Sequence, residues 1–378
     1  MKNSIKWTLG IALVAIVLIL VIRPYFTGDA TFDNSGTIKI GFVGILSGDA
    51  ATWGQSGLAG ATLAVKEVND QGGINGKKVE LVIEDDKLSS TESINAFNKL
   101  INVDEVTAII SSESSGAAST AVPVAQSKGV PVVIATASAP KMTLVGDYVF
   151  RVTPSDNFQG KYAAEYVYKV LGKKKIAILY VNNDWGVGIK EVFEKRYREL
   201  GGEIVYQNSF KQDEKDFKIQ FSQIKQSDAE LLYYLAYPLN ALSGFKQLKE
   251  MNLNIPILCG DAIEDESVLK NEYAEGIRYT IAKINSPEEF SSKLNSLQGF
   301  ENLKPNIAAP MGYDATKILL NAIKAAGTDR EKIRDELAQT KYYGISNPVI
   351  EFDENRELKD ASAEVKIIRN GKAVRYTD

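Results

Sequence analysis

Short runs of β-branched and aliphatic residues alternate along most of the chain with longer stretches whose apolar residues recur every three or four positions. The short runs predict strands, and the longer stretches predict amphipathic helices. Strands are expected at residues 37–45, 78–84, 106–110, 130–134, 175–181, 203–209, 231–235 and 255–258. Helices are expected at residues 54–69, 91–102, 115–127, 157–171, 187–200, 216–226 and 239–251. This alternation is typical of an α/β fold in which helices cover mainly parallel sheets.

The predicted strands are too many for one ordinary sheet, so we expect two lobes. The pattern breaks at residues 151–156, where Pro154 interrupts it and Ser155 is placed to begin the next helix. After residue 285 the same reading predicts helices at 287–297, 306–326 and 330–340 and strands at 348–352 and 363–369.

The lobe boundaries follow from three expected crossings of the chain, near Ser155, Asn285 and Ser346. Crossings of this kind form a hinge between two halves and make each lobe discontinuous in sequence. The expected division assigns residues 37–155 and 284–345 to lobe 1 and residues 156–283 and 346–378 to lobe 2.

The N-terminal segment, residues 1–30, has a different character from the rest. Residues 7–22 carry no charge and are nearly all apolar, and they follow Lys2 and Lys6, so this run favours a lipid bilayer. It predicts an export signal or a membrane anchor. A small-residue cleavage pattern occurs only at residues 28–30, well beyond the apolar run, which favours an uncleaved anchor and an extracytoplasmic location. The single cysteine is Cys259, which excludes lipid attachment at an N-terminal cysteine.

Composition argues against several classes of function. The 378 residues carry a formal net charge of −4, and the body beyond the basic N-terminal segment is more acidic still, which disfavours nucleic-acid partners. The chain contains no histidine, so a Ser-His-Asp triad, a His-ligated zinc and imidazole catalysis are excluded. The glycine run at residues 186–191 lacks the third glycine of a dinucleotide fingerprint. We expect no catalytic residue, no cofactor and no metal.

Ligands of open parallel sheets bind at the carboxyl ends of the strands, so the loops there hold the candidate residues. In the first half, Trp53 follows the first predicted strand, and Ser115 follows the third at the start of a helix. Backbone N–H groups and hydroxyls at a helix start suit a carboxylate. Thr136 and Ser138 follow the fourth strand and could complete the same anion pocket. The alternatives are that Trp53 only packs on its helix and that Ser115 only caps one.

In the second half, Trp185, Tyr237 and Asp261 follow successive predicted strands. They supply two aromatic rings and one carboxylate. Asp261 follows a buried strand and is a candidate partner for an ammonium group, although a solvated turn aspartate is the alternative for such a position.

Several motifs in these regions together resemble the type I periplasmic binding proteins of branched-chain amino-acid ABC transporters, the leucine/isoleucine/valine-binding family. The resemblance covers roughly residues 37–368. The motifs are IKIGFVGILSG at 38–48, GGING at 72–76, EDD at 84–86, FRVTPSD at 150–156 and GYDA at 312–315. The family implies a two-lobed fold with three hinge crossings.

The resemblance also implies a role for each candidate residue. Ser115 and Ser138, with nearby backbone N–H groups, would hold the α-carboxylate of an amino acid, and Asp261 would receive its α-ammonium. The other matching positions line the cleft: Trp53, Thr136 (through its carbonyl), Trp185 and Tyr237. Departures from the family occur at residues 111–113 and 134–135, which bear on the identity of the ligand side chain.

The expected function is that of an extracytoplasmic solute-binding protein that delivers a small amino-acid-like ligand to the permease of an ABC importer. We expect a monomer with the N-terminal segment in the membrane. A membrane-anchored receptor that senses the same ligand without transport is the alternative. A cytoplasmic nucleotide-using enzyme is a third reading, which the N-terminal segment and the missing phosphate motif oppose.

Overall fold

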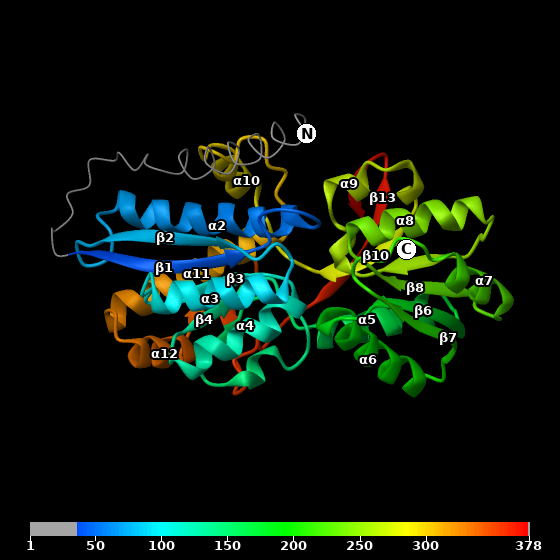
Figure 1. The fold of residues 1–378 in the computed structure, drawn as a ribbon, viewed down its shortest axis with the longest axis horizontal. Coiled ribbons are helices and arrows are strands. Elements are labelled where there is room, and N and C mark those ends of the chain that lie inside the picture. The colour runs from blue at the N-terminus through cyan, green and yellow to red at the C-terminus, as the bar shows by residue number, and fades with distance from the viewer. Residues whose placement is uncertain (1–35, 377–378) are drawn as a thin grey trace, which may run out of the picture.

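The computed structural model describes residues 36–376. Within that range two helix-covered sheets form separate lobes, joined by segments that pass between them (Figure 1). The predicted segment at residues 1–30 lies outside the described residues. Within the described range, no helix is both long and apolar enough to span a bilayer.

The first lobe is built on a five-stranded sheet whose paired strands are all parallel, in the order β2-β1-β3-β4-β5. The strands are β1 Thr37–Gly44, β2 Lys78–Asp85, β3 Ile109–Ser112, β4 Val132–Ile134 and β5 Val149–Arg151. Its helices are α2 Ala51–Asp70, α3 Ser90–Asn102, α4 Ser115–Ser127, α10 Glu288–Asn295, α11 Ala308–Ala326 and α12 Arg330–Ala338. One core packs α2 and α11 on the sheet, and another packs α3 and α4 on it. The parallel order places the carboxyl ends of β1, β3 and β4 side by side.

The second lobe contains a seven-stranded sheet in the order β14-β13-β10-β9-β8-β6-β7. Its strands are β6 Lys175–Val181, β7 Glu203–Phe210, β8 Leu231–Leu235, β9 Ile257–Cys259, β10 Arg278–Ala282, β13 Ala363–Arg369 and β14 Lys372–Arg375. Its helices are α5 Asp156–Glu165, α6 Asp184–Glu199, α7 Lys218–Gln226, α8 Pro238–Glu250 and α9 Glu266–Leu269. Strands β13 and β14 pair antiparallel at one edge, whereas β7, β6, β8, β9 and β10 are parallel. The candidate loops of this lobe therefore meet at one edge too.

The chain passes from the first lobe to the second later than expected at its third crossing. Residues after Ser346 were expected in lobe 2. Instead, β12 Ile350–Glu351 pairs with β11 Lys341–Tyr342, and Ile350, Phe352 and Leu358 pack in the core of the first lobe. The apolar side chains of this short ribbon find their partners on the first sheet, so the crossing to β13 falls after Leu358.

Some elements escaped the pattern. Strand β5 has three residues, too few for a periodic signal, and β10 follows irregular turns and is nearly all buried. The helix expected at residues 157–171 ends as an α-helix at Glu165 and continues as a π-helical turn over Tyr166–Val170. These differences leave the βα alternation unchanged.

Helices α2 and α11 approach each other closely because glycine removes the side chain at two contact points. A Cβ atom at Gly60 would collide with the carbonyl oxygen of Ala309, and one at Gly312 would collide with the carbonyl oxygen of Gly57. Backbone therefore packs on backbone between two segments that lie far apart in sequence, and α11 completes the core on that face of the first sheet.

Candidate ligand-binding cleft

One pocket lies between the two lobes and receives residues from both. All seven predicted site residues line it, together with Ile45, Ala50, Glu113, Ser114 and Ala262. The empty space between these side chains is about 440 Å³, including the part open to solvent. That size is typical of pockets for small molecules. The structure therefore brings the candidate residues of the two halves together across a single gap.

The N-terminus of α4 forms part of the wall from the first lobe. Ser114 is the N-cap residue, and its hydroxyl accepts the N–H of Ala117 at 3.2 Å. Ser115, the first residue of the helix, accepts the N–H of Ala139 at 3.1 Å. Because the Ser115 oxygen is an acceptor in that bond, its own proton remains free to donate to a ligand. Capping and a free donor therefore fall on two neighbouring serines.

The loop after β4 supplies Thr136 and Ser138. The Thr136 hydroxyl donates to the carbonyl of Glu113 at 2.8 Å and so ties this loop to the one after β3. The Ser138 hydroxyl donates to the Asp156 carboxylate at 3.1 Å. The expected role of Ser138 was to hold a carboxylate, but its hydroxyl proton is directed at another acid. Its backbone N–H is the donor that this residue still offers.

The wall from the second lobe is aromatic. The Trp185 and Tyr237 rings lie 5.4 Å apart between centroids with 33° between their planes, and both are buried. Asn183 caps α6 by accepting the N–H of Gly186 and donates to the Tyr237 hydroxyl at 3.3 Å, which fixes both rings. Gly260 lies so close to the Trp185 ring that a Cβ atom there would come within 2.9 Å.

Asp261 follows β9 at the start of a short 3₁₀ turn and is only 8% exposed. Burial raises the pKa of this carboxyl to about 7, and the charge of Glu264 raises it further, while a hydrogen bond from Gln159 opposes the shift. Within the described chain, none of the side chains lining the pocket is a lysine or arginine. A cationic group entering the pocket would therefore meet a buried carboxylate that has no cation of its own.

Sequence reasoning missed two acids near the pocket. Asp156 was read as part of a helix cap, but it lies buried behind Ser138, and its pKa is raised by burial and by the charge of Asp261. Glu113 lines the pocket, yet its carboxylate accepts hydrogen bonds from Ser93 and, at 2.6 Å, from Ser111 inside the first lobe. Burial raises the pKa of Glu113 to about 8. A polar run after a buried strand was the only signal for this acid.

Trp53 fits both readings that its sequence position allowed. It packs against the cores of both lobes and also lines the pocket. Its indole Nε1 is buried, and no acceptor within residues 36–376 bonds to it. An unpaired buried N–H is costly, so an acceptor supplied by a ligand would be favourable there.

The fold and the pocket define a two-lobed binding protein that encloses a small molecule between its halves. The sequence profile of the periplasmic binding protein family matches residues 37–372, and the chain belongs to that family. Membership confirms the resemblance drawn from the motifs and implies an extracytoplasmic location. Within the described residues, no group of three or more His, Cys, Asp or Glu side chains could hold a metal ion.

Named relatives point the same way. The leucine-, isoleucine-, valine-, threonine- and alanine-binding protein of Pseudomonas aeruginosa is 25% identical over 329 residues, which is 86% of this chain and 88% of the relative. Among solved structures, a leucine-binding protein from Thermotoga maritima matches with a TM-score of 0.83 at 28% identity, covering 90% of this chain and 98% of that one.

A second solved structure is the branched-chain amino acid transporter substrate-binding protein of Streptococcus pneumoniae, in complex with isoleucine. It matches with a TM-score of 0.79 at 29% identity and covers 89% of this chain and 97% of that one. These likenesses confirm the predicted two-lobed α/β fold.

Proposed function

We propose that this chain is the solute-binding component of an ABC importer and that it encloses an amino acid or a similar small zwitterion in the cleft between its lobes. The family and the named relatives, which bind branched-chain amino acids, support this function. Importer rather than sensor is favoured because one of these relatives carries a transporter name. Its permease subunits would then be the protein partners, and one copy of the chain would bind one ligand.

The observation that carries the proposal is the distribution of polar groups around the pocket. Neutral donors lie at the N-terminus of α4, on the first lobe, and the buried carboxylate of Asp261 comes from the second lobe. A zwitterion has the complementary pair of charges at opposite ends of its backbone. Each charge-assisted hydrogen bond in such a closed site contributes roughly 1.5–3 kcal/mol net.

Binding and closure would be linked through the chain crossings. Ser115 and the Ser138 loop would hold the carboxylate on the first lobe while the lobes are apart. Rotation about the crossings would then bring Trp185, Tyr237 and Asp261 onto the ligand and expel water. Closed-form contacts already join the lobes, because Gln212 donates to the carbonyl of Leu88 at 3.2 Å.

We also propose that residues 1–30 attach the protein to the outer face of the cell membrane. The evidence is the apolar, uncharged run that follows two lysines. Carbonate extraction of membranes tests this point, because an anchored chain stays in the membrane pellet and a cleaved one is released.

A calorimetric screen of purified protein tests the function, with leucine, leucinamide, isoamylamine, 4-methylpentanoate and benzoate as probes. Leucine is expected to bind far more tightly than the analogues that lack one charge, because each analogue leaves either Asp261 or the anion site unpaired. Binding of 4-methylpentanoate or benzoate as tight as that of leucine would contradict the role of Asp261. A wider thermal-shift screen of amino acids then ranks the side chains, since ligand binding raises stability by mass action.

A further inference from the structure

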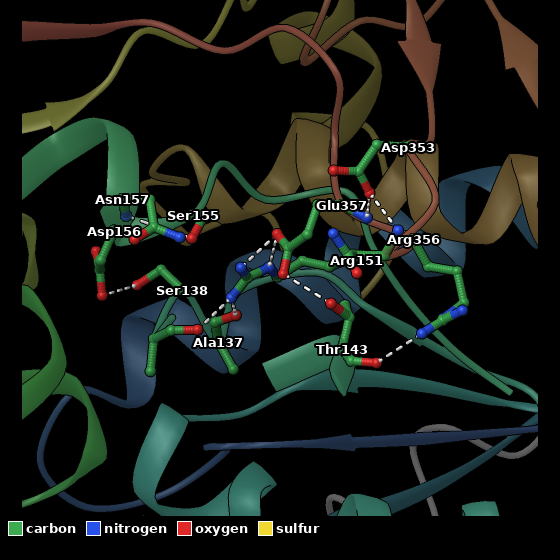
Figure 2. A network of polar contacts seen from close by, with 12 residues as sticks. Ala137, Ser138, Thr143, Arg151, Ser155, Asp156, Asn157, Asp353, Arg356 and Glu357 are labelled. Carbon is green, nitrogen blue, oxygen red and sulfur yellow. Dashed lines mark hydrogen bonds and ion pairs between the residues drawn. The ribbon is translucent and has the colours of Figure 1, made fainter. Parts of the chain in front are cut away.

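A buried arginine lies behind the pocket at the junction of the lobes (Figure 2). Arg151 ends β5, is fully buried and does not line the pocket. Its Nη1 donates to the carbonyl of Ala139 at 2.6 Å and to that of Ala137 at 3.2 Å. Its Nε donates to Glu357 at 2.9 Å, and Nη2 pairs with the same carboxylate. One guanidinium therefore joins the loop that carries Ser138 to a distant segment of chain.

That distant segment is the turn at residues 353–357, just before the third crossing. Glu357 also accepts the hydroxyl of Thr143 at 2.8 Å, and its N–H donates to Asp353 at 3.0 Å. The N–H of Arg151 in turn donates to the carbonyl of Arg356 at 3.1 Å. Figure 2 shows these contacts converging on the guanidinium from one side. The position of Arg151 is thus fixed independently of the pocket.

The contacts with the loop determine which way its peptide groups face. In a trans peptide the carbonyl and the N–H point in opposite directions. The carbonyl of Ala137 faces Arg151, so the N–H of Ser138, in the same peptide group, faces away from it. Within residues 36–376, no acceptor is bonded to that N–H, and Ser138 lines the pocket.

We propose that Arg151 is a positioning residue for ligand binding: by holding the carbonyls of Ala137 and Ala139 it turns the N–H of Ser138 toward the cleft, as a donor for the carboxylate of the ligand. This proposal rests on the proposed function for the nature of the ligand. Because the charge of Arg151 is paired with Glu357, the contribution of the arginine is the direction of a dipole and not attraction at a distance.

Arginine is suited to this place because its planar fork reaches several acceptors at once. A lysine keeps the charge and one strong contact, but it cannot hold two carbonyls and a carboxylate in a fixed geometry. Arg151→Lys is therefore the informative variant, since it retains a cation beside Glu357. Arg334→Lys serves as the matched control, because Arg334 forms its ion pairs on the outside of the first lobe with Asp147 and Asp335.

Hydrogen exchange of the ligand-free protein tests the positioning without any assumption about the ligand. Arg151→Lys is expected to speed amide exchange at least several-fold in the peptide that spans residues 135–140, with little change in α7 on the second lobe. Arg334→Lys is expected to leave residues 135–140 unchanged. Unaltered exchange in Arg151→Lys would overturn the proposal whatever the protein binds.

Calorimetry with leucine and leucinamide tests the consequence for the carboxylate. Arg151→Lys is expected to weaken leucine binding about tenfold or more and leucinamide binding less than threefold, because only leucine presents an anion to the Ser138 N–H. Equal weakening of both probes would show a general structural role and overturn the proposal. If the wild-type protein binds no zwitterion, the proposed function fails, and the exchange measurement alone decides the role of Arg151.

Discussion

The two walls of the cleft use different chemistry for the two ends of the proposed ligand. The wall from the first lobe offers hydroxyls and backbone N–H groups, and its one acid, Glu113, directs its carboxylate into the lobe interior. The wall from the second lobe offers two aromatic rings and the carboxylate of Asp261, buried without a lysine or arginine among the side chains lining the pocket.

This difference shows how each wall tolerates an empty site. The neutral donors of the first lobe partly satisfy one another, as Ser115 does with Ala139, so they remain in place without a ligand. Asp261 has no such relief, and burial raises its pKa to about 7. The second wall is therefore the more sensitive of the two, both to substitution and to pH.

The largest effect is expected from Asp261→Asn. The amide keeps the shape but removes the charge, so the ammonium of the ligand is buried without its partner, which costs about 2–5 kcal/mol. Affinity for leucine, measured by calorimetry, should fall about 30-fold or more. Asp213→Asn removes an exposed charge on the same lobe and should leave the affinity unchanged. An Asp261→Asn variant that binds leucine normally would exclude the assigned role.

A smaller loss is expected on the first wall from Ser115→Ala. A hydrogen bond to a charged group contributes roughly 1.5–3 kcal/mol, so affinity should fall about 10- to 100-fold. Ser114→Ala is the paired variant, because Ser114 caps α4. It should lower thermal stability by about 1 kcal/mol with a lesser effect on affinity. The reverse pattern would assign capping and binding to the wrong serines.

Acidification should weaken binding by up to about tenfold per pH unit below pH 7, and little above it. The reason is that Asp261, with its pKa raised to about 7, must lose a proton before it can receive an ammonium group. Calorimetry between pH 5.5 and 8.5 measures this slope, and Asp261→Asn should make it shallower. A wild-type affinity independent of pH would contradict a protonated empty site.

The stability of the empty protein should respond in the opposite sense. The folded-state pKa of Asp261 lies above its ordinary value of 3.8, so the folded chain binds this proton more tightly than the unfolded chain does. Its contribution to stability is therefore lost as pH rises through about 7. Melting temperatures of the wild type relative to Asp261→Asn should increase as pH falls from 8 to 5.

The smallest effect is expected where the lobes meet at the surface. Lys304 pairs with Glu266 across the lobes at 2.6 Å, with both side chains largely exposed. Exposed ion pairs contribute little, so Lys304→Ala should weaken leucine binding less than about threefold, and added salt should remove the difference. A larger loss would mean that this contact, and not the pocket, controls closure.

The sequence predicted the βα alternation, the two lobes and the residues that converge on the pocket. Those predictions succeeded because parallel strands place their carboxyl ends at one edge, so loop position is readable from strand order. Asp261 and Ser115 follow from that rule together with their side-chain chemistry. Their binding roles remain predictions that the variants above test.

Other features depend on contacts that no local pattern encodes. The late third crossing arises because Ile350 and Phe352 pack on the first sheet, and a short apolar run does not state which sheet it joins. Asp156 reads as an ordinary residue of a helix start, and only the fold brings it behind Ser138. Arg151 and Glu357 lie more than two hundred positions apart, so their pairing follows from the topology alone.

The backbone contact between α2 and α11 has a consequence for the order of events during synthesis. A nascent chain of 300 residues already contains every strand of the first sheet, but it lacks α11, which begins at Ala308. One face of that sheet must then stay uncovered while the second half is being made, and contacts so distant in sequence form slowly. Protection from aggregation by a chaperone is most needed in that interval.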